Sequence, residues 1–363
     1  MSASVPRSPD VASEARLLGI RREAERQGRL EVAGVRPPGA PFPQASPEAG
    51  YYGLPLLKRP AWTWQVPLYF FIGGATGAAG VICAMADWVG RDRELARHAR
   101  LVATGGALLS SGLLIGDLGR PDRFLGMLRV FKRQSPMSVG AWILAAFGSS
   151  SSAAVFARWL QERLDWRPVR VIGNIAQFSS AVLGLPLSNY TGVLIGATAI
   201  PVWNENVSTL PLHFGMSGLN SGVGILELLG HNDSRALNLL GILAAAVETW
   251  EGFHIETSSQ PAMEPLKRGV SGRLTRIGGV LSGPLPLALR LASVVTGSRR
   301  ARRRATYSSL VGSLITRFAW MLAGHASAKD YRLPLEISQQ RPQQPAVILD
   351  QQAEADSEER LAV

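Results

Sequence analysis

The stretch VPLYFFIGGATGAAGVICAMADW, residues 66–88, is an apolar run whose one charged residue, Asp87, lies close to its end. A helix of roughly 17 to 25 apolar residues can cross the ~30 Å hydrocarbon core of a bilayer. Comparable runs follow at residues 100–117, 137–157, 170–199, 208–229, 236–256, 276–296 and 306–325. We therefore expect an all-α fold, a polytopic transmembrane bundle of about eight helices.

Nine helices are an alternative, because residues 170–199 form a run longer than one perpendicular span requires. Pro186, Ser188 and Asn189 lie in its second half. A proline inside a helix removes a backbone hydrogen bond and is a common cause of kinks. This run is expected to bend, to tilt or to split into two spans.

The distribution of polar and apolar residues along the chain indicates the fold class better than the average composition does. The 363 residues are 46% hydrophobic with a mean hydropathy of +0.10, which alone settles no class. Polar residues concentrate in an N-terminal, Pro-rich tail (1–60) and a C-terminal tail (328–363), so 61–327 is the predicted bundle. The first 60 residues lack the short apolar core of a signal peptide.

Basic residues exceed acidic ones, with a formal net charge of +11, a balance also found in proteins that bind nucleic acid. The arginines, however, lie at the ends of apolar runs, as in SRRARRR at 298–304. Positive charge at the ends of spans is typical of cytoplasmic loops. We interpret these arginines as topology signals.

Two sets of loops alternate along the predicted bundle. Loops 89–99, 158–169, 230–235 and 297–305 fall on one side, and loop 118–136 falls on the other with both tails. The first set carries more arginine per residue and is expected in the cytoplasm. The difference in basic residues between the two sets of loops is small, because loop 118–136 is basic too.

Small residues recur four apart in several spans, which predicts close helix packing in lipid. The pairs are Gly73 with Gly77, Gly192 with Gly196, and Gly218 with Gly222. Cys83 is the one cysteine in the chain. An iron–sulfur cluster ordinarily takes four thiolates, so the chain is not expected to hold its own.

Ionisable groups inside a bilayer cost about 2.5 to 3.5 kcal/mol each and are functional candidates by default. Toward the side of loop 118–136 lie Asp117, Glu205, His213, Glu251, His254 and Glu256, with Gln65, Tyr69 and Tyr190. Toward the other side lie Asp87, His98, Glu227 and His231, and Glu248 lies deeper. Some of these residues could instead cap helix ends or, like tyrosines at interfaces, reach water.

A quinone ring needs hydrogen-bond donors at its two carbonyls and groups that exchange two protons. Tyrosine, histidine and carboxylate side chains near one membrane face supply that chemistry. The side of loop 118–136 is therefore the predicted site for a lipid-soluble redox carrier.

Four stretches resemble the NrfD/polysulfide reductase membrane-subunit family. They are YGLP at 52–55 with WTW at 62–64 and YFFIGG at 69–74, DLGRPDRF at 117–124, SPMSVGAW at 135–142, and YTGVL at 190–194 with PVW at 201–203. The resemblance runs from about Tyr52 to Lys329.

The resemblance implies a bundle of eight or more helices that binds quinone, menaquinone or ubiquinone, without haem. It implies two partners, a four-cluster ferredoxin-like iron–sulfur subunit and a molybdopterin catalytic subunit, and a place in the bacterial inner membrane. The implied role is a membrane anchor that exchanges electrons and protons between the quinone pool and the iron–sulfur subunit. The chain would hold no complete active site of its own.

The family's quinone tyrosine corresponds to Tyr190. Where a relative has Asn and His at the start of the first helix, this chain has Val66 and Tyr69, so the donor there is Tyr69 or Gln65. We expect the following roles: quinone binding by Tyr190, Tyr69, Gln65 and Trp64; proton relay by Asp117, His213, Glu251, His254 and Glu248; partner docking by Arg120, Arg123, Arg129, Lys132 and Arg133.

Three other functions stay open. A cytochrome b-type subunit would bind haem between paired histidines such as His213 and His254. A transporter would use buried charges such as Glu227 and Glu248. A passive anchor would have lost quinone binding, a reading that Val66 allows.

Overall fold

The computed structural model describes residues 57–58, 60–118, 124–164 and 166–330, with a few isolated residues in the tails. The chain divides into a unit spanning Pro55–Asp330 and another made of Met1–Leu54 and Tyr331–Val363. The description below concerns the first unit. The predicted tails lie almost wholly outside the described residues, so the domain boundaries stay a prediction.

The described part of the chain is helical and contains no strand. Its elements are α2 (Gln65–Met85), η1 (Ala86–Gly90), α3 (Arg93–Asp117), α4 (Phe124–Met127), α5 (Pro136–Gln161), α6 (Arg167–Gly196), α7 (Pro201–Asn204), α8 (Leu210–Leu226), η3 (Glu227–His231), α9 (Arg235–Thr257), η4 (Pro261–Met263), α10 (Glu264–Lys267), α11 (Gly269–Ser282), α12 (Pro284–Thr296) and α13 (Arg299–Lys329). The all-α helical bundle is confirmed.

Each of the eight predicted spans coincides with a long helix or with a pair of consecutive helices. Five of them are long and apolar enough to cross a membrane by length and composition: Gln65–Gly90, Arg93–Asp117, Pro136–Gln161, Arg167–Gly196 and Gly269–Thr296. Helices α8, α9 and α13 coincide with the other three predicted spans and carry buried polar side chains.

The fourth predicted span is one helix, α6, with Pro186 inside it. The polar side chains near Pro186 bond to the backbone of the same helix. Ser188 Oγ and Asn189 Nδ2 donate hydrogen bonds to the carbonyl of Leu185 at 2.9 and 3.0 Å. The nine-span alternative, which required a break here, is not what the structure shows.

The seventh predicted span, 276–296, falls within the candidate span Gly269–Thr296, which consists of two consecutive helices. Helix α11 ends at Ser282 and α12 begins at Pro284, with Gly283 between them at φ −103° and ψ −98°. Proline disfavours the helical conformation of the residue that precedes it and supplies no backbone N–H. The sequence Gly283-Pro284 therefore interrupts the apolar run near its middle.

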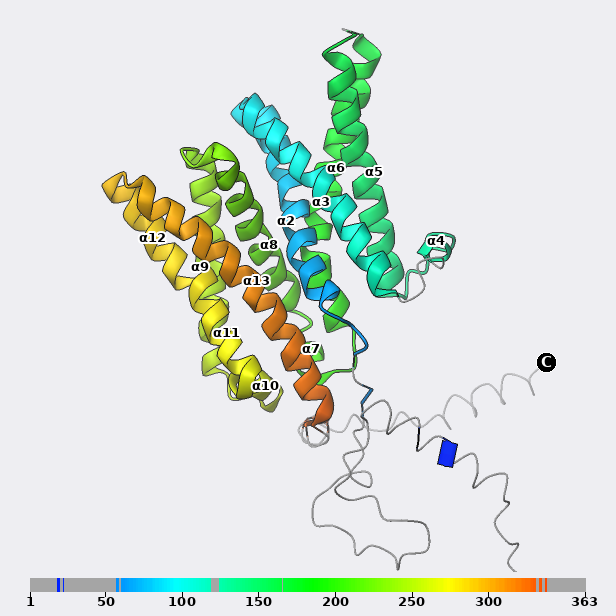
Figure 1. Ribbon diagram of the computed structural model, residues 1–363, viewed down its shortest axis with the longest axis vertical. Helices are drawn as coiled ribbons and strands as arrows, with labels where there is room; N and C mark the ends of the chain where they lie inside the picture. The colour runs from blue at the N-terminus through cyan, green and yellow to red at the C-terminus, as the bar shows by residue number, and fades with distance from the viewer. Residues whose placement is uncertain are drawn as a thin grey trace, which may run out of the picture. The chain divides into compact units, whose positions relative to one another are not determined.

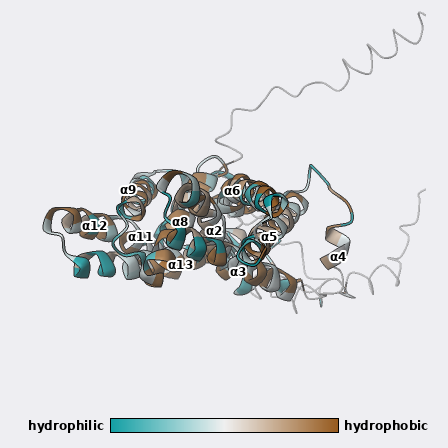
Figure 2. Cartoon of the chain, turned by 90° about the horizontal axis from the view of Figure 1, so that it is seen from above, coloured by the Kyte–Doolittle hydropathy of each residue, from teal (hydrophilic) through white to brown (hydrophobic). Residues whose placement is uncertain are grey.

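Two groups of helices lie side by side in Figures 1 and 2. The first bundle contains α2, α3, α5 and α6, and the second contains α8, α9, α11, α12 and α13. Helix α2 contacts both α6 and α8. A Cβ built on Gly77 would lie 2.5 Å from the carbonyl oxygen of Gly184, and one on Gly218 would lie 2.9 Å from Gly74. Glycine at these positions lets the backbones approach.

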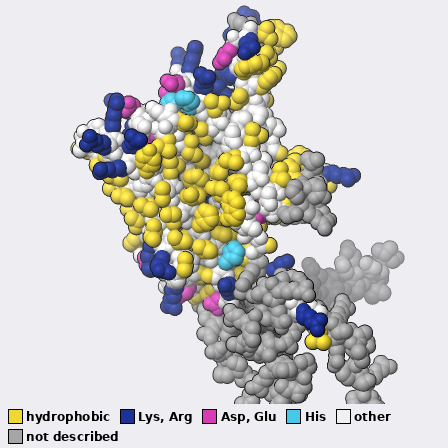
Figure 3. Space-filling model, in the orientation of Figure 1, with side chains coloured by type: hydrophobic (Ala, Val, Ile, Leu, Met, Phe, Trp, Pro, Cys, Tyr) yellow, Lys and Arg dark blue, Asp and Glu magenta, His cyan; other side chains and the backbone are white. Residues whose placement is uncertain are grey.

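The connections alternate between the two ends of the helices (Figure 1). The short-loop end carries the connections at 91–92, 162–166, 232–234 and 297–298, whereas the long-loop end carries α4, α7 and η4 with α10. This alternation matches the two predicted sets of loops. Between the ends, the visible face is mainly hydrophobic and is bordered by charged side chains (Figure 3). Such a belt is the surface expected of a chain embedded in a bilayer.

Candidate functional site

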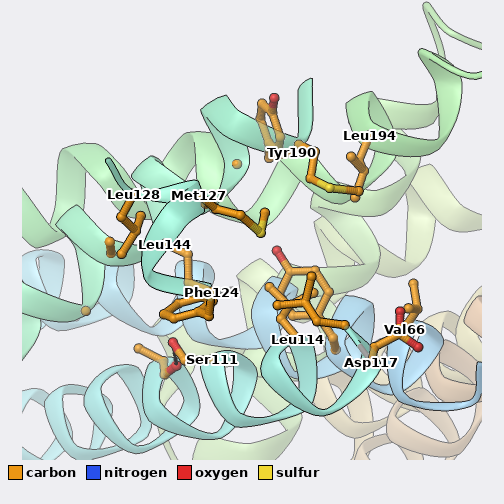
Figure 4. Close-up of a pocket in the computed structure, with 18 of the residues that line it drawn as sticks. Val66, Ser111, Leu114, Asp117, Phe124, Met127, Leu128, Leu144, Tyr190 and Leu194 are labelled. Carbon is orange, nitrogen blue, oxygen red and sulfur yellow. Dashed lines mark hydrogen bonds between the residues drawn. The ribbon is translucent and has the colours of Figure 1, made fainter. Parts of the chain in front are cut away.

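A cavity of about 640 Å³ lies in the first bundle, toward the long-loop end. Helices α2, α3, α5 and α6 form its walls, and α4 contributes Phe124 and Met127. Figure 4 shows Tyr190 and Leu194 on one side of this cavity and Leu114 and Asp117 on the other. Its volume falls in the ~300–1,000 Å³ range of small-molecule sites.

Most of the cavity wall is apolar. Aliphatic and aromatic side chains come from each of the four helices: Val66, Leu108, Leu114, Leu118, Met137, Leu144 and Leu194, with Trp62 just before α2. Polar atoms are few and come chiefly from Tyr69, Tyr190, Asp117 and the serines Ser111, Ser149 and Ser152. A flat, mainly apolar molecule with a few hydrogen-bonding atoms fits such a lining.

Tyr190 lies near the C-terminal end of α6, and its ring packs against α5 at Gly140. A Cβ on Gly140 would lie 2.6 Å from the Cε1 atom of the tyrosine. The Tyr190 hydroxyl donates to the carbonyl of Pro136, the first residue of α5. The absence of a side chain at Gly140 therefore sets the position of this phenol at the cavity.

Tyr69 lies one turn into α2 and is 3% exposed. Its ring lies over Gly73, whose Cβ would be 3.1 Å from the Tyr69 Cε2 atom. Among the described residues, no hydrogen-bond partner is found for the Tyr69 hydroxyl, although the residue lines the cavity. An unpaired hydroxyl at the wall of an apolar cavity is a donor available to a ligand.

Asp117, the last residue of α3, joins that helix to the start of α2. Its Oδ1 atom accepts hydrogen bonds from the backbone N–H of Thr63 at 3.1 Å and from the Thr63 hydroxyl at 2.7 Å. Its Oδ2 atom makes no hydrogen bond within the described part of the chain. The carboxylate is thus fixed by one oxygen while the residue lines the cavity.

The other two predicted quinone ligands do not line the cavity. Trp64 is 60% exposed, and Gln65 has a buried Oε1 atom that makes no hydrogen bond to a described residue. Trp62 lines the cavity instead, and its ring stacks on that of Trp203 at 5.6 Å between centroids. Val66 and Tyr69, three residues apart on α2, share one face of that helix, but Trp62 lies before the helix begins, so no helical spacing in the sequence marked it.

The predicted proton-relay residues divide between the two bundles. Asp117 lies at the cavity, whereas His213, Glu248 and Glu251 are buried in the second bundle, each at most 5% exposed. His213 accepts a hydrogen bond from Trp320 at its Nε2 atom, 3.1 Å away. His254 is exposed and stacks on Trp250.

Three predicted docking residues, Arg129, Lys132 and Arg133, are exposed in the segment between α4 and α5. The same segment exposes the apolar side chains Val130 and Phe131, 54% and 53% accessible. Arg120 and Arg123 lie outside the described residues. Within the described residues there is no group of three or more His, Cys, Asp and Glu that could hold a metal ion.

Buried arginines were missed by the sequence analysis, which considered only acidic residues, histidines and tyrosines inside the spans. Arg290 and Arg317 are 0% and 1% exposed. Both lie inside predicted spans, so the rule that ionisable groups in a membrane are functional candidates would have found them.

The family model described as "Polysulphide reductase, NrfD" matches residues 57–232 of the chain. The matched region contains every residue that lines the cavity, and it ends at the turn that precedes α9. No curated protein matches the chain.

Proposed function

Through residues 57–232 the chain belongs to the NrfD family of oxidoreductase membrane subunits, and from this premise we propose that it exchanges electrons and protons between the quinone pool and a peripheral iron–sulfur subunit. The membrane in question would be the bacterial inner membrane. A molybdopterin subunit would carry the reaction at the far end of the complex. This chain would supply the quinone site.

The observation that carries the proposal is the cavity with the unpaired Tyr69 hydroxyl. Tyr69 and Tyr190 line the same cavity from α2 and α6. A quinone has two carbonyl oxygens, each of which accepts a hydrogen bond, on a ring whose tail is apolar. Tyr69 would donate to one carbonyl, and Tyr190 to the other after exchanging its bond to Pro136. The apolar lining would accommodate the ring and the first part of the tail.

Proton transfer at this site would use Asp117. The bound group supplies two-electron chemistry, which takes up or releases two protons. Asp117 has one oxygen, Oδ2, without a hydrogen bond to any described residue, and it lies at the end of α3, next to the long-loop end. A carboxylate in that place can pass protons between the cavity and water. His213, Glu248, Glu251 and His254 would not serve this cavity directly, because they come from α8 and α9 of the second bundle.

The exposed segment with Arg129, Lys132 and Arg133 supports docking of a partner at the long-loop end. Its apolar pair, Val130 and Phe131, would form the centre of the contact, and the basic side chains would meet an acidic rim. Phe131 is held edge-on against Trp142 of α5, 6.1 Å between ring centroids. Because Met137 of the same helix lines the cavity, the proposed contact and the quinone site would be close together.

The test is quinol-linked turnover of the assembled complex with Tyr69→Phe and Tyr190→Phe. Each variant removes one hydroxyl and leaves the ring, so we expect a weaker interaction with quinone by about 0.5–1.5 kcal/mol per hydrogen bond, seen as a raised KM for quinol. The matched control is Tyr307→Phe, since Tyr307 lies on α13 and does not line the cavity. Unchanged kinetics in both cavity variants would count against the quinone site.

A further inference from the structure

The second bundle has a polar interior that the proposed quinone site does not use. Three helices each bury polar side chains: α8 contributes Ser217, Asn220 and Ser221, with Glu227 just beyond its end; α9 contributes Asn238, Glu248 and Glu251; α13 contributes Thr306, Ser309, Ser313 and Arg317. Each of them is at most 6% exposed. We call this set the inner polar axis. Most of its members recur three or four residues apart along each helix, which places them on one face.

Within the described part of the chain, many atoms of the inner polar axis make no hydrogen bond of standard geometry. They are Ser217 Oγ, Asn220 Oδ1, Glu248 Oε1, Glu251 Oε1, Ser309 Oγ, Ser313 Oγ, and Arg317 Nε and Nη1, with Ser282 Oγ beside them. Of these, the side chains of Ser217, Asn220 and Ser282 lie close enough to the Glu248 carboxyl group to interact with it. Buried polar groups in proteins are almost always satisfied by protein or by ordered water. Internal waters typically bind about three such groups each. A cluster of this density is therefore expected to be hydrated.

Arg317 and Glu248 are ionisable groups of opposite type that lie near each other in the middle of the axis, and they form no ion pair. The guanidinium donates from Nη2 to the carbonyl of Phe214 at 2.8 Å and lies over the Phe214 ring at 3.9 Å, so its other nitrogens remain free. Water between the carboxylate and the guanidinium would satisfy both groups.

The break between α11 and α12 lies beside this pair. Ser217, Asn220 and Ser282 surround the Glu248 side chain, and Ser282 is the last residue of α11. The carbonyl of Ser282 accepts a hydrogen bond from Asn220 Nδ2 at 2.9 Å. In membrane proteins, interrupted helices occur where the backbone lines a polar cavity or an ion path.

The axis is closed toward the short-loop end by a buried ion cluster. Glu227 Oε1 and Oε2 accept from Arg290 at 2.8 and 2.9 Å, and Oε1 also accepts from Arg302 at 3.2 Å. Thr306 donates to Glu227 Oε2 at 2.5 Å. Glu227 and Arg290 are both 0% exposed. Two arginines and one carboxylate leave a net positive charge, which opposes the passage of cations.

Toward the long-loop end the axis continues to Glu251, one turn after Glu248 on α9. His213 of α8 also lies at this end, and its Nδ1 atom has no partner. Because Nε2 accepts from Trp320, the neutral ring carries its proton on Nδ1 and presents a donor. Glu251 and the Nδ1–H donor of His213 thus lie at the same end of the axis.

We propose that the inner polar axis is a hydrated proton path, separate from the quinone cavity, which connects water at the long-loop end with Glu248. A proton from water adds to a Glu248 carboxylate oxygen by way of Glu251 and the internal waters, and it leaves by the same route. No covalent bond other than O–H forms or breaks. The Glu227–Arg290–Arg302 cluster closes the path before the short-loop end.

The first test is infrared spectroscopy of the full-length chain during exchange from H₂O to D₂O, over about pH 5 to 9, a range in which perturbed carboxyl groups titrate. We expect a carboxylic acid C=O band that shifts within minutes of exchange and disappears in Glu248→Gln but not in Tyr307→Phe. A Glu248 band that stays unshifted for hours would overturn the proposal. The absence of any Glu248 band across this range would do the same. The measurement needs neither quinone nor a partner, so its outcome is independent of the quinone proposal.

The second test compares two serines of equal burial after replacement of the one cysteine, Cys83→Ser. Ser313 is 0% exposed and its hydroxyl is unpaired, whereas Ser151 of α5 is 1% exposed and donates to the carbonyl of Gly148. A thiol reacts as thiolate and therefore needs water. Ser313→Cys should react with a small methanethiosulfonate at least roughly tenfold faster than Ser151→Cys. Equal rates would show a dry interior and contradict the proposal.

Discussion

At the scale of single residues, Gly140 determines where the Tyr190 phenol lies. An alanine Cβ there would be 2.6 Å from the Tyr190 ring, so Gly140→Ala should displace the ring and break its bond to Pro136. Overpacking of this kind typically costs about 1–3 kcal/mol of stability. We also expect a higher KM for quinol in the assembled complex.

The matched control for this change is Gly112→Ala on α3. A Cβ at Gly112 meets no atom within 4 Å, so this variant should keep both its stability and its quinol kinetics. If Gly140→Ala kept the stability and the quinol kinetics of the control, the packing of Tyr190 against α5 would have no effect on function.

Replacing the buried carboxylate of Glu227 should destabilise the chain more than replacing any other single charged residue of the second bundle. Glu227→Gln leaves Arg290 fully buried without its counter-ion. Removing one partner of a buried ion pair costs about 3–5 kcal/mol. Denaturation of the purified chain in detergent measures this loss, with the exposed Glu162→Gln as the control. A loss below about 1 kcal/mol, the size typical of exposed pairs, would mean that water reaches the cluster.

Part of the candidate site was predictable from the sequence, because some of its residues can be recognised one at a time as polar side chains in apolar runs. Tyr69, Tyr190 and Asp117 were chosen as polar residues near span ends, and all three line the cavity. Position along a helix does not tell which bundle a residue faces, however. His213 and Glu251 were placed at the correct end, yet they lie in the second bundle. Only the packing of α8 and α9 reveals that separation.

At the scale of elements, the long helices were predictable and the helix interruptions were not. Apolar length is a strong signal, so all eight predicted runs coincide with helices. Pro186 and Pro284 show why breaks are harder to predict. Pro186 lies inside a continuous helix, whereas Pro284 begins a new one. The difference is that Gly283 precedes Pro284, and glycine can leave the helical conformation at little steric cost.

Contact between the two bundles depends on glycines in α2 and α8. A Cβ on Gly218 would lie 2.9 Å from backbone atoms of Gly74, and backbone cannot move aside as a flexible side chain can. Gly218→Ala should therefore push α8 from α2 and destabilise the chain by about 1–3 kcal/mol. Thermal unfolding in detergent measures the effect. Gly252→Ala on α9, where a Cβ meets nothing within 4 Å, should leave unfolding unchanged.

At the scale of the whole bundle unit, the mainly apolar cavity and the inner polar axis belong to two different sets of helices. The cavity proposed to bind quinone lies among α2, α3, α5 and α6, within the region that matches the family model, whereas the inner polar axis also uses α9 and α13, which lie beyond it. Helix α2 contacts α8 and α13 as well as its own bundle. Helix α6 also contacts α8, so α2 and α6 both join the first bundle to the second.

The long-loop end should be where the partner subunit binds. Reversing three exposed charges, with Arg129→Glu, Lys132→Glu and Arg133→Glu together, would replace attraction to an acidic partner by repulsion. We expect slower association of the iron–sulfur subunit with the membrane-embedded chain, and a difference from wild type that shrinks as salt rises from ~0.01 to ~1 M, because the Debye length falls from ~30 to ~3 Å.

The control is the same number of reversals at the short-loop end, on exposed Arg93, Arg97 and Arg300. These reversals change the net charge equally, so any general effect of charge on association would appear in both variants. Association slowed only by the long-loop reversals would identify that end as the docking face. Association slowed only by the short-loop reversals would place the partner on the side away from the proposed quinone site, and electron transfer between them would then have to cross the bundle.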